Sequence, residues 1–176
     1  MKIKYGDIET DVIWKVPTKE IFESWKRDFF KLEDVELFDV YLVGGFLEKL
    51  YGKTKYTEDV DIILTGCDNR KKIENLIYEG TKFGLEKYQI FFDVLWFDNL
   101  PLYYKMKNDE VKNIKIYLLS DKWVVDGKVK KQYNNAKQVR KNLWEMNCSF
   151  PTYKQKQKIN DGYVYLKPML INGSLE

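Results

Sequence analysis

Histidine is missing from this 176-residue chain, and cysteine is scarce: the two cysteines are Cys67 and Cys148. Without histidine the chain cannot build a Cys/His zinc site, or a Ser–His or Cys–His nucleophile pair. Two distant cysteines without a Cys-x-x-Cys spacing also give no disulfide framework. Any metal site must therefore use carboxylate oxygens, which suit Mg²⁺ or Mn²⁺. Any proton acceptor must be a carboxylate, lysine, tyrosine or water.

Long apolar runs are lacking too. No stretch approaches the roughly 18 apolar residues of a membrane span, and residues 1–14 have no apolar segment typical of signal peptides. We therefore expect no membrane association and, with reduced cysteines, a cytoplasmic protein. No linker or repeat divides the chain. It is predicted to fold as a single domain over residues 1–176, with a core of about 18–132 and a basic C-terminal extension of 133–176.

The apolar content of 44%, including 16% aromatic residues, is sufficient for a core. Charge is uneven, because residues 122–158 hold ten Lys and Arg residues against two acids, a net charge of +8. Such a segment can attract nucleic acid or another anion, and the alternative is a solvated lysine-rich surface. The candidate RNA-contacting residues are Lys128, Lys130, Lys131, Lys137, Arg140 and Lys141.

Apolar periodicity and turn residues predict alternating helices and strands, with residues 2–16 extended. Strands are predicted at 38–43, 60–64, 89–97, 111–119 and 122–132, and helices at 18–32, 46–51, 68–83 and 135–147. Thr18 and Asp68 are the expected N-caps, Gly52 and Gly84 the expected helix ends, and Asp126-Gly127 the expected hairpin turn. The predicted fold class is α/β (α+β), a mixed sheet flanked by helices.

Two acids begin the predicted strand at 60–64. Because side chains alternate along a strand, Asp59 and Asp61 point the same way. Two like charges this close repel each other, and a divalent cation between them converts the repulsion into coordination. The alternative is an exposed strand end with solvated acids, although Ile62, Ile63 and Leu64 direct this strand into the core.

A third acid, Asp93, interrupts the apolar run IFFDVLWF, which is typical of a strand buried on both faces. A buried carboxylate needs a cation, a proton or an edge open to water. If this strand neighbours the Asp59/Asp61 strand, all three acids converge on one site. Two metal ions about 3.5–4 Å apart could then bridge the reacting oxygens of a phosphoryl displacement. The alternative is a structural ion pair with one Lys or Arg.

Gly44 and Gly45 stand where a predicted strand passes into a helix. The missing side chains would let a phosphate approach the backbone, and helix N-terminal amides favour an anion. Lys71 and Lys72, early in the next predicted helix, are candidates for contacts with phosphate oxygens. The alternative for both lysines is an ordinary surface position.

The order of these motifs resembles the nucleotidyltransferase superfamily typified by DNA polymerase β. The motifs are an apolar strand, the glycine pair, a short helix, the Asp-x-Asp strand and the later strand with Asp93. The run LVGGFLEKLYG…EDVDIIL is most similar to the head domain of poly(A) polymerases and CCA-adding enzymes, and the resemblance covers residues 40–97. It implies Mg²⁺ (or Mn²⁺) held by Asp59 and Asp61, and Asp93 as the acid that helps to activate the acceptor hydroxyl. Gly44 and Gly45 would hold the triphosphate of an NTP such as ATP, and attack on the α-phosphate would release pyrophosphate.

The chain departs from this pattern at residues 46–49, where the Arg-Asp pair of CCA-adding enzymes is missing. It also has Gly-Gly at residues 44–45, where many small relatives have Gly-Ser. There is also no room for the large helical domain that selects tRNA or poly(A) ends. We therefore predict a minimal stand-alone nucleotidyltransferase, with RNA, protein or a small molecule as acceptor. The alternatives are a nucleotide- or RNA-binding module without turnover, and one component of a toxin–antitoxin or phage-defence pair.

Overall fold

The computed structural model describes the chain with its side chains at residues 15–53, 57–103, 160–162 and 166–173. Elsewhere it describes the backbone of seven strands: β1 (Lys2–Tyr5), β2 (Ile8–Asp11), β6 (Val111–Leu118), β7 (Val124–Val125), β8 (Lys128–Val129), β9 (Tyr133–Arg140) and β10 (Leu143–Phe150).

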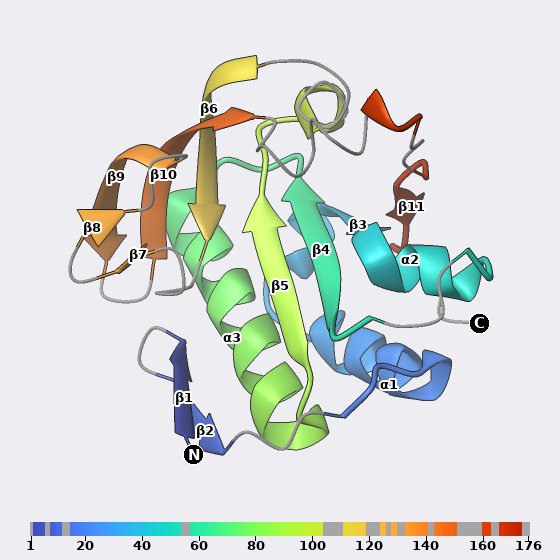
Figure 1. Ribbon diagram of the computed structural model, residues 1–176. Coiled ribbons are helices and arrows are strands. Elements are labelled where there is room, and N and C mark those ends of the chain that lie inside the picture. Colours follow the sequence, from blue (N-terminus) through green and yellow to red (C-terminus); the bar gives the residue numbers. More distant parts are fainter. Residues whose placement is uncertain are drawn as a thin grey trace.

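Within these described residues, one large sheet has the strand order β11-β3-β4-β5-β6-β10-β9 (Figure 1). Its remaining strands are β3 (Asp39–Val43), β4 (Asp59–Thr65), β5 (Phe91–Trp96) and β11 (Met169–Leu170). Strands β4 and β5 run parallel, and the other neighbouring pairs are antiparallel. The prediction of a mixed sheet flanked by helices is confirmed.

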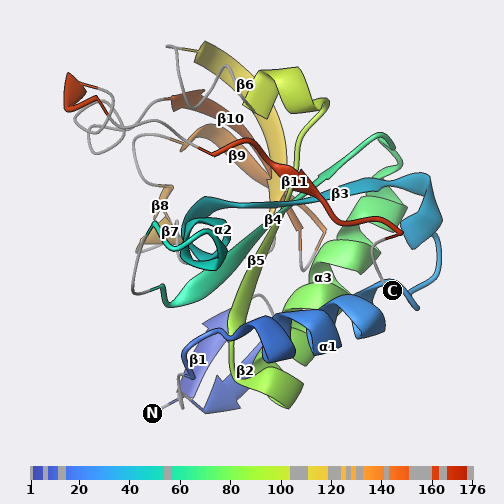
Figure 2. The same cartoon turned by 90° about the vertical axis from the view of Figure 1, so that its right-hand side faces the viewer.

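Helices lie on both sides of the central strands, namely α1 (Lys19–Phe29), the 3₁₀ turn η1 (Val35–Leu37), α2 (Gly44–Leu50) and α3 (Arg70–Tyr88). Helices α1 and α3 cover one face, and α2 lies across the other (Figure 2). Val60, Ile62 and Leu64 belong to the core on the α1/α3 face. Because side chains alternate along β4, Asp59 and Asp61 project from the opposite face.

Trp25 of α1 lies at the centre of the core and is fully buried. Its ring stacks on Phe29 at 4.6 Å and on Phe92 of β5 at 4.3 Å between centroids. Its indole N–H donates a hydrogen bond to the carbonyl of Gly80, at 2.9 Å. One side chain therefore joins α1, α3 and the strand that carries Asp93.

Several predicted elements are confirmed. Thr18 caps α1, with its hydroxyl accepting from the Ile21 amide at 3.2 Å. Strands β3, β4, β5 and β6 lie where the apolar runs predict them, and the short strands β7 and β8 pair across the predicted Asp126-Gly127 turn. Helix α2 begins at Gly44, two residues earlier than expected.

The helix predicted over residues 135–147 is wrong, because β9 and β10 occupy this segment. Strand β10 lies between β6 and β9 in the sheet, so pairing on both sides overrides the helical spacing of its apolar residues. As a result, β9, β10 and β11, all from the predicted extension of residues 133–176, are strands of the same sheet as the predicted core.

The predicted ends of α3 are also wrong. Asn69, not Asp68, is its N-cap, with Oδ1 accepting from the Lys72 amide at 3.1 Å. The helix continues through Gly84 to Tyr88. At Gly84 a Cβ atom would lie 2.7 Å from Cδ2 of Phe92, so this glycine lets the helix pack closely on β5 instead of ending it.

A segment near the C-terminus completes the other side of the sheet, with β11 paired to β3. The Asn172 side chain accepts from the Val40 amide at 2.7 Å and donates to the Phe38 carbonyl at 2.8 Å. Ile171 is buried and donates its amide to the Val40 carbonyl at 2.9 Å. Backbone and side-chain bonds thus attach residues 169–172 along β3.

Among the described residues, no helix combines the length and apolar character that a membrane crossing requires.

Asp28 of α1 connects this helix to the C-terminal turn of α3. Burial by itself raises the pKa of Asp28, but hydrogen bonds donated by Lys87 (2.8 Å) and by the Tyr88 hydroxyl outweigh it, so the pKa is lowered from its ordinary value.

A lowered folded-state pKa means that this contribution to stability is present above the ordinary value of 3.8 and is lost as the pH falls through the folded pKa. We expect Asp28→Asn to reduce the free energy of unfolding by about 1 kcal/mol or less at neutral pH. Urea denaturation at pH 7 and pH 3 should show this deficit shrinking in acid. A deficit of the same size at both values would contradict the assignment.

Candidate metal centre

Three aspartates meet on the face of the sheet opposite α1 and α3. Asp61 of β4 and Asp93 of β5 are register partners across the parallel pair, and Asp59 precedes Asp61 on the same side of β4. One carboxylate oxygen from each residue lies within 4.8 Å of the others. Asp93 is 8% exposed, whereas Asp59 and Asp61 are half-buried. The structure brings together the three acids that the sequence identifies, and together they could hold a metal ion.

The apolar side chains between these acids fix their direction. Val60 and Ile62 alternate with Asp59 and Asp61 and are completely buried on the other face. A slip of one residue in the register would bury both carboxylates and expose the apolar set. The core therefore holds the acids on their side of the sheet.

The predicted glycine turn lies directly against this acid cluster. Gly44 has a φ of +77°, and a Cβ atom built on it would lie 2.3 Å from Oδ2 of Asp61. Its neighbour Gly45 faces Thr57, with Oγ1 of Thr57 3.1 Å from the position of a Cβ. The missing side chain at Gly44 is therefore what allows the backbone and the Asp61 carboxylate to approach each other.

The donor set fits a hard divalent cation. Mg²⁺ binds oxygen at about 2.0–2.1 Å, so ligand oxygens on one octahedral ion are separated by about 3–4 Å. The observed upper limit of 4.8 Å between the carboxylate oxygens can close through small side-chain rotations. Two ionised carboxylates at this distance repel each other by roughly 3 kcal/mol at an effective dielectric constant of about 20. A bound cation would offset this repulsion.

Lys71 and Lys72 do not lie with the three acids. They belong to the first turn of α3, which follows the carboxyl end of β4, whereas Asp61 lies near the amino end of that strand. The four residue-to-residue steps from Asp61 to Thr65 span about 13 Å. Lys72 instead lies 3.7 Å from the carboxylate of Asp34. The order of the sequence already indicates this separation, because the predicted helix at 68–83 follows the carboxyl end of a strand whose amino end carries Asp59 and Asp61.

The candidate RNA-contacting residues are described in part. Lys128 belongs to β8, and Lys137 and Arg140 belong to β9. Strand β9 is an edge strand of the large sheet, and β6 and β10 lie between it and β5. Lys130, Lys131 and Lys141 lie outside the described residues.

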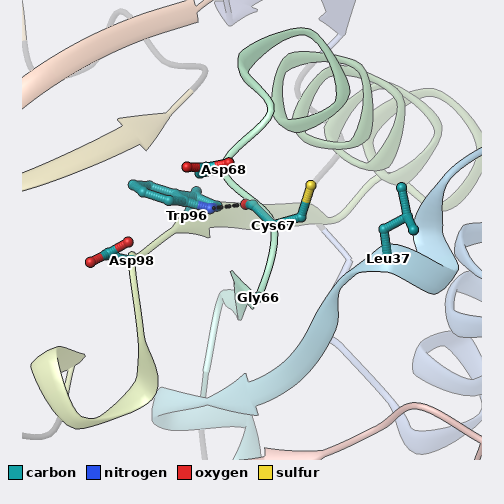
Figure 3. Close-up of a pocket in the computed structure, with 6 residues that line it drawn as sticks. All are labelled: Leu37, Gly66, Cys67, Asp68, Trp96 and Asp98. Carbon is teal, nitrogen blue, oxygen red and sulfur yellow. Dashed lines mark hydrogen bonds between the residues drawn. The ribbon is translucent and has the colours of Figure 1, made fainter.

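A separate hollow of about 480 Å³ lies at the carboxyl ends of β4 and β5 (Figure 3). It is lined by Leu37, Gly66, Cys67, Asp68, Trp96 and Asp98. Asp68 and Asp98 lie on either side of the Trp96 indole, whose N–H donates to the Cys67 carbonyl at 2.7 Å (Figure 3). This hollow is at the opposite end of the strands from Asp59. Its two acids therefore provide control positions for charge removal.

Thr57 also lies beside the site, although no pattern in the sequence predicts it there. This residue is 8% exposed, and its hydroxyl donates to the Asp59 carbonyl at 3.0 Å. A hydroxyl residue two positions before the first acid is too common to be a signal on its own.

Comparisons with protein-family models, with curated proteins and with solved structures find no match for this chain. The resemblance of residues 40–97 to nucleotidyltransferases therefore depends on their own motifs, and the functional proposal depends on the chemistry of the acid cluster and the glycine turn.

Proposed function

We propose that the protein is an Mg²⁺-dependent nucleotidyltransferase, which moves a nucleoside monophosphate from an NTP to an acceptor and releases pyrophosphate. The observation that carries this proposal is the contact between Gly44 and Asp61, where a Cβ atom would lie 2.3 Å from the carboxylate oxygen. This contact supports the proposal because a phosphate bound at the glycine turn would lie beside a carboxylate cluster suited to a divalent cation.

Each residue of the site has a distinct task in this proposal. Asp59 and Asp61, which are half-buried, hold the cation while remaining accessible to a nucleotide. Asp93 lies deeper, and in this proposal it would accept the proton of the attacking acceptor hydroxyl. Gly44 and Gly45 give the triphosphate access to the backbone. When bound, the metal supplies positive charge that offsets the charge of the phosphate oxygens.

The test compares three proteins: the parent, Asp59→Asn/Asp61→Asn, and the control Asp68→Asn/Asp98→Asn. Both double variants lose two carboxylates, the first from the site and the second from the hollow at the other end of β4 and β5. Each protein is incubated with every α-³²P-labelled NTP, Mg²⁺ or Mn²⁺, and total cellular RNA and protein.

We expect the parent and the control to transfer label, and the site variant to fall by about 1,000-fold or to background, because electrostatic stabilisation is the largest part of such catalysis. The labelled fraction identifies the acceptor as RNA or protein. Equal transfer by the site variant would refute the assignment. Metal-dependent NTP binding by the parent without any transfer would instead indicate a nucleotide-binding module.

A further inference from the structure

Thr57 contacts both parts of the proposed site. Its hydroxyl donates to the carbonyl of Asp59, the first residue of β4, at 3.0 Å. The same oxygen lies 3.1 Å from where a Cβ on Gly45 would be, and the Thr57 Cβ lies 3.6 Å from that point. Because Thr57 is 8% exposed, these contacts are sheltered from water. One buried side chain therefore lies between the metal-binding strand and the glycine turn.

We propose that Thr57 is a positioning residue, which sets the placement of Asp59 relative to the Gly44–Gly45 turn and so controls the affinity of the site for a divalent cation. The inference depends on the proposed metal site. It assigns a role to a residue outside the acid cluster and outside the glycine pair.

The strand pairing shows why Asp59 needs such support. On one side, β5 pairs with β4 from Asp59 to Leu64, and Asp59 is the register partner of Phe91. On the other side, β3 pairs with β4 only as far as Val43 and Asp61, because the chain then turns into α2. Asp59 therefore lies beyond the part of β4 that pairs with β3, and the Thr57 hydroxyl bonds to its carbonyl there.

Gly45 provides an independent probe of the same contact. Its φ is not positive, so alanine is compatible with its backbone, in contrast to Gly44. Among the described residues beyond its chain neighbours and its own helix, the atoms within 4 Å of its Cβ position belong to Thr57. Gly45→Ala would therefore press on the Thr57 hydroxyl without contacting a carboxylate.

The first experiment measures Mn²⁺ affinity by titration calorimetry, with and without ATP, for the parent, Thr57→Val and Thr57→Ser. Valine preserves the shape of threonine but removes the hydrogen bond to Asp59, whereas serine preserves the hydroxyl. We expect about 10-fold or greater weakening in Thr57→Val, as for other residues that orient metal ligands, and affinity near that of the parent in Thr57→Ser.

Thermal unfolding without metal separates positioning from stability alone. A purely structural Thr57 would lower the unfolding temperature in Thr57→Val and leave the Mn²⁺ affinity of the folded protein unchanged. Parent-like affinity in Thr57→Val would therefore overturn the proposal.

A double-mutant cycle tests the contact itself. Gly45→Ala is expected to weaken Mn²⁺ binding in the parent and to have a smaller effect in Thr57→Ala, where the opposing hydroxyl is absent. Simple additivity would show that the two residues act independently and would also overturn the proposal.

These measurements distinguish a failure of the proposed nucleotidyl transfer from a failure of the proposed role of Thr57. If the parent binds no Mn²⁺, with or without ATP, the proposed metal site is refuted, and the proposed role of Thr57 is refuted with it. A parent that binds Mn²⁺ through a Thr57-dependent site but transfers no label refutes nucleotidyl transfer and supports the positioning role.

Discussion

Replacing Gly44 by alanine is expected to abolish Mn²⁺ binding and nucleotidyl transfer while the protein remains folded. The new Cβ would lie 2.3 Å from Oδ2 of Asp61, a distance that non-bonded atoms cannot adopt, so the carboxylate must swing away or the turn must move. The first movement takes Asp61 out of the proposed cation site, and the second shifts the turn away from it; a displacement of about 1 Å already costs on the order of 100-fold in a site that depends on exact placement.

The control for Gly44→Ala is Gly52→Ala. Both glycines have a positive φ, +77° and +74°, so alanine adds about 1–2 kcal/mol of backbone strain at either position. Apart from Gly52 itself and its two chain neighbours, no described residue has an atom within 4 Å of the Cβ position at Gly52. Titration calorimetry with Mn²⁺ should therefore show binding in Gly52→Ala and none in Gly44→Ala. Equal affinities would show that the contact with Asp61 is not critical.

Trp25→Ala is expected to have the largest effect on stability. The substitution removes the ring stacked between Phe29 and Phe92 and leaves a cavity in a core where Trp25 is completely buried. It also removes the hydrogen bond to the Gly80 carbonyl. Large-to-small changes of this kind cost about 3–5 kcal/mol, and the loss of the indole hydrogen bond adds about 0.5–1.5 kcal/mol. Because whole domains are stable by about 5–15 kcal/mol, this loss is a large part of the total stability.

Urea denaturation followed by circular dichroism measures this loss. Trp25→Phe is the matched variant, since it preserves an aromatic ring beside Phe92 and removes the indole N–H. We expect an intermediate cost, with Mn²⁺ binding preserved in the folded fraction because the carboxylate of Asp93 projects from the other face. A loss below about 1 kcal/mol in Trp25→Ala would contradict the central place of this ring in the core.

The part of the fold that positions the acids could be predicted from the sequence because each strand there carries a strong local signal. Strands β3, β4 and β5 correspond to continuous apolar runs. Period-two alternation predicts that Asp59 and Asp61 share a face. The sequence could not predict that Asp61 pairs with Asp93, because the neighbours of a strand in a sheet are not encoded locally. It indicated only that the acids would converge if the two strands were neighbours.

The wrong secondary-structure predictions lie where tertiary packing, and not local sequence, determines the conformation. Gly84 is typical of a helix end, but the structure uses it inside α3, where Phe92 leaves no room for a side chain. Residues 135–147 have helical spacing, yet two neighbouring strands draw the segment into the sheet.

Strand β11 and Thr57 could not be found from the sequence because their partners are distant or are backbone atoms. Nothing in residues 169–172 indicates pairing with β3, and a bond to the Asp59 carbonyl leaves no trace in composition.

The attachment of residues 169–172 to β3 affects the protein during its synthesis on the ribosome. Asn172 is separated from its partner Val40 by 132 residues, which take roughly 7 to 26 seconds to translate at about 5–20 residues per second. During that interval the outer edge of β3 displays unpaired amides and carbonyls within an apolar segment. Such an edge is a template for pairing with another nascent chain. Newly made protein should therefore be most prone to aggregation, and most dependent on chaperones, just before residues 169–172 emerge.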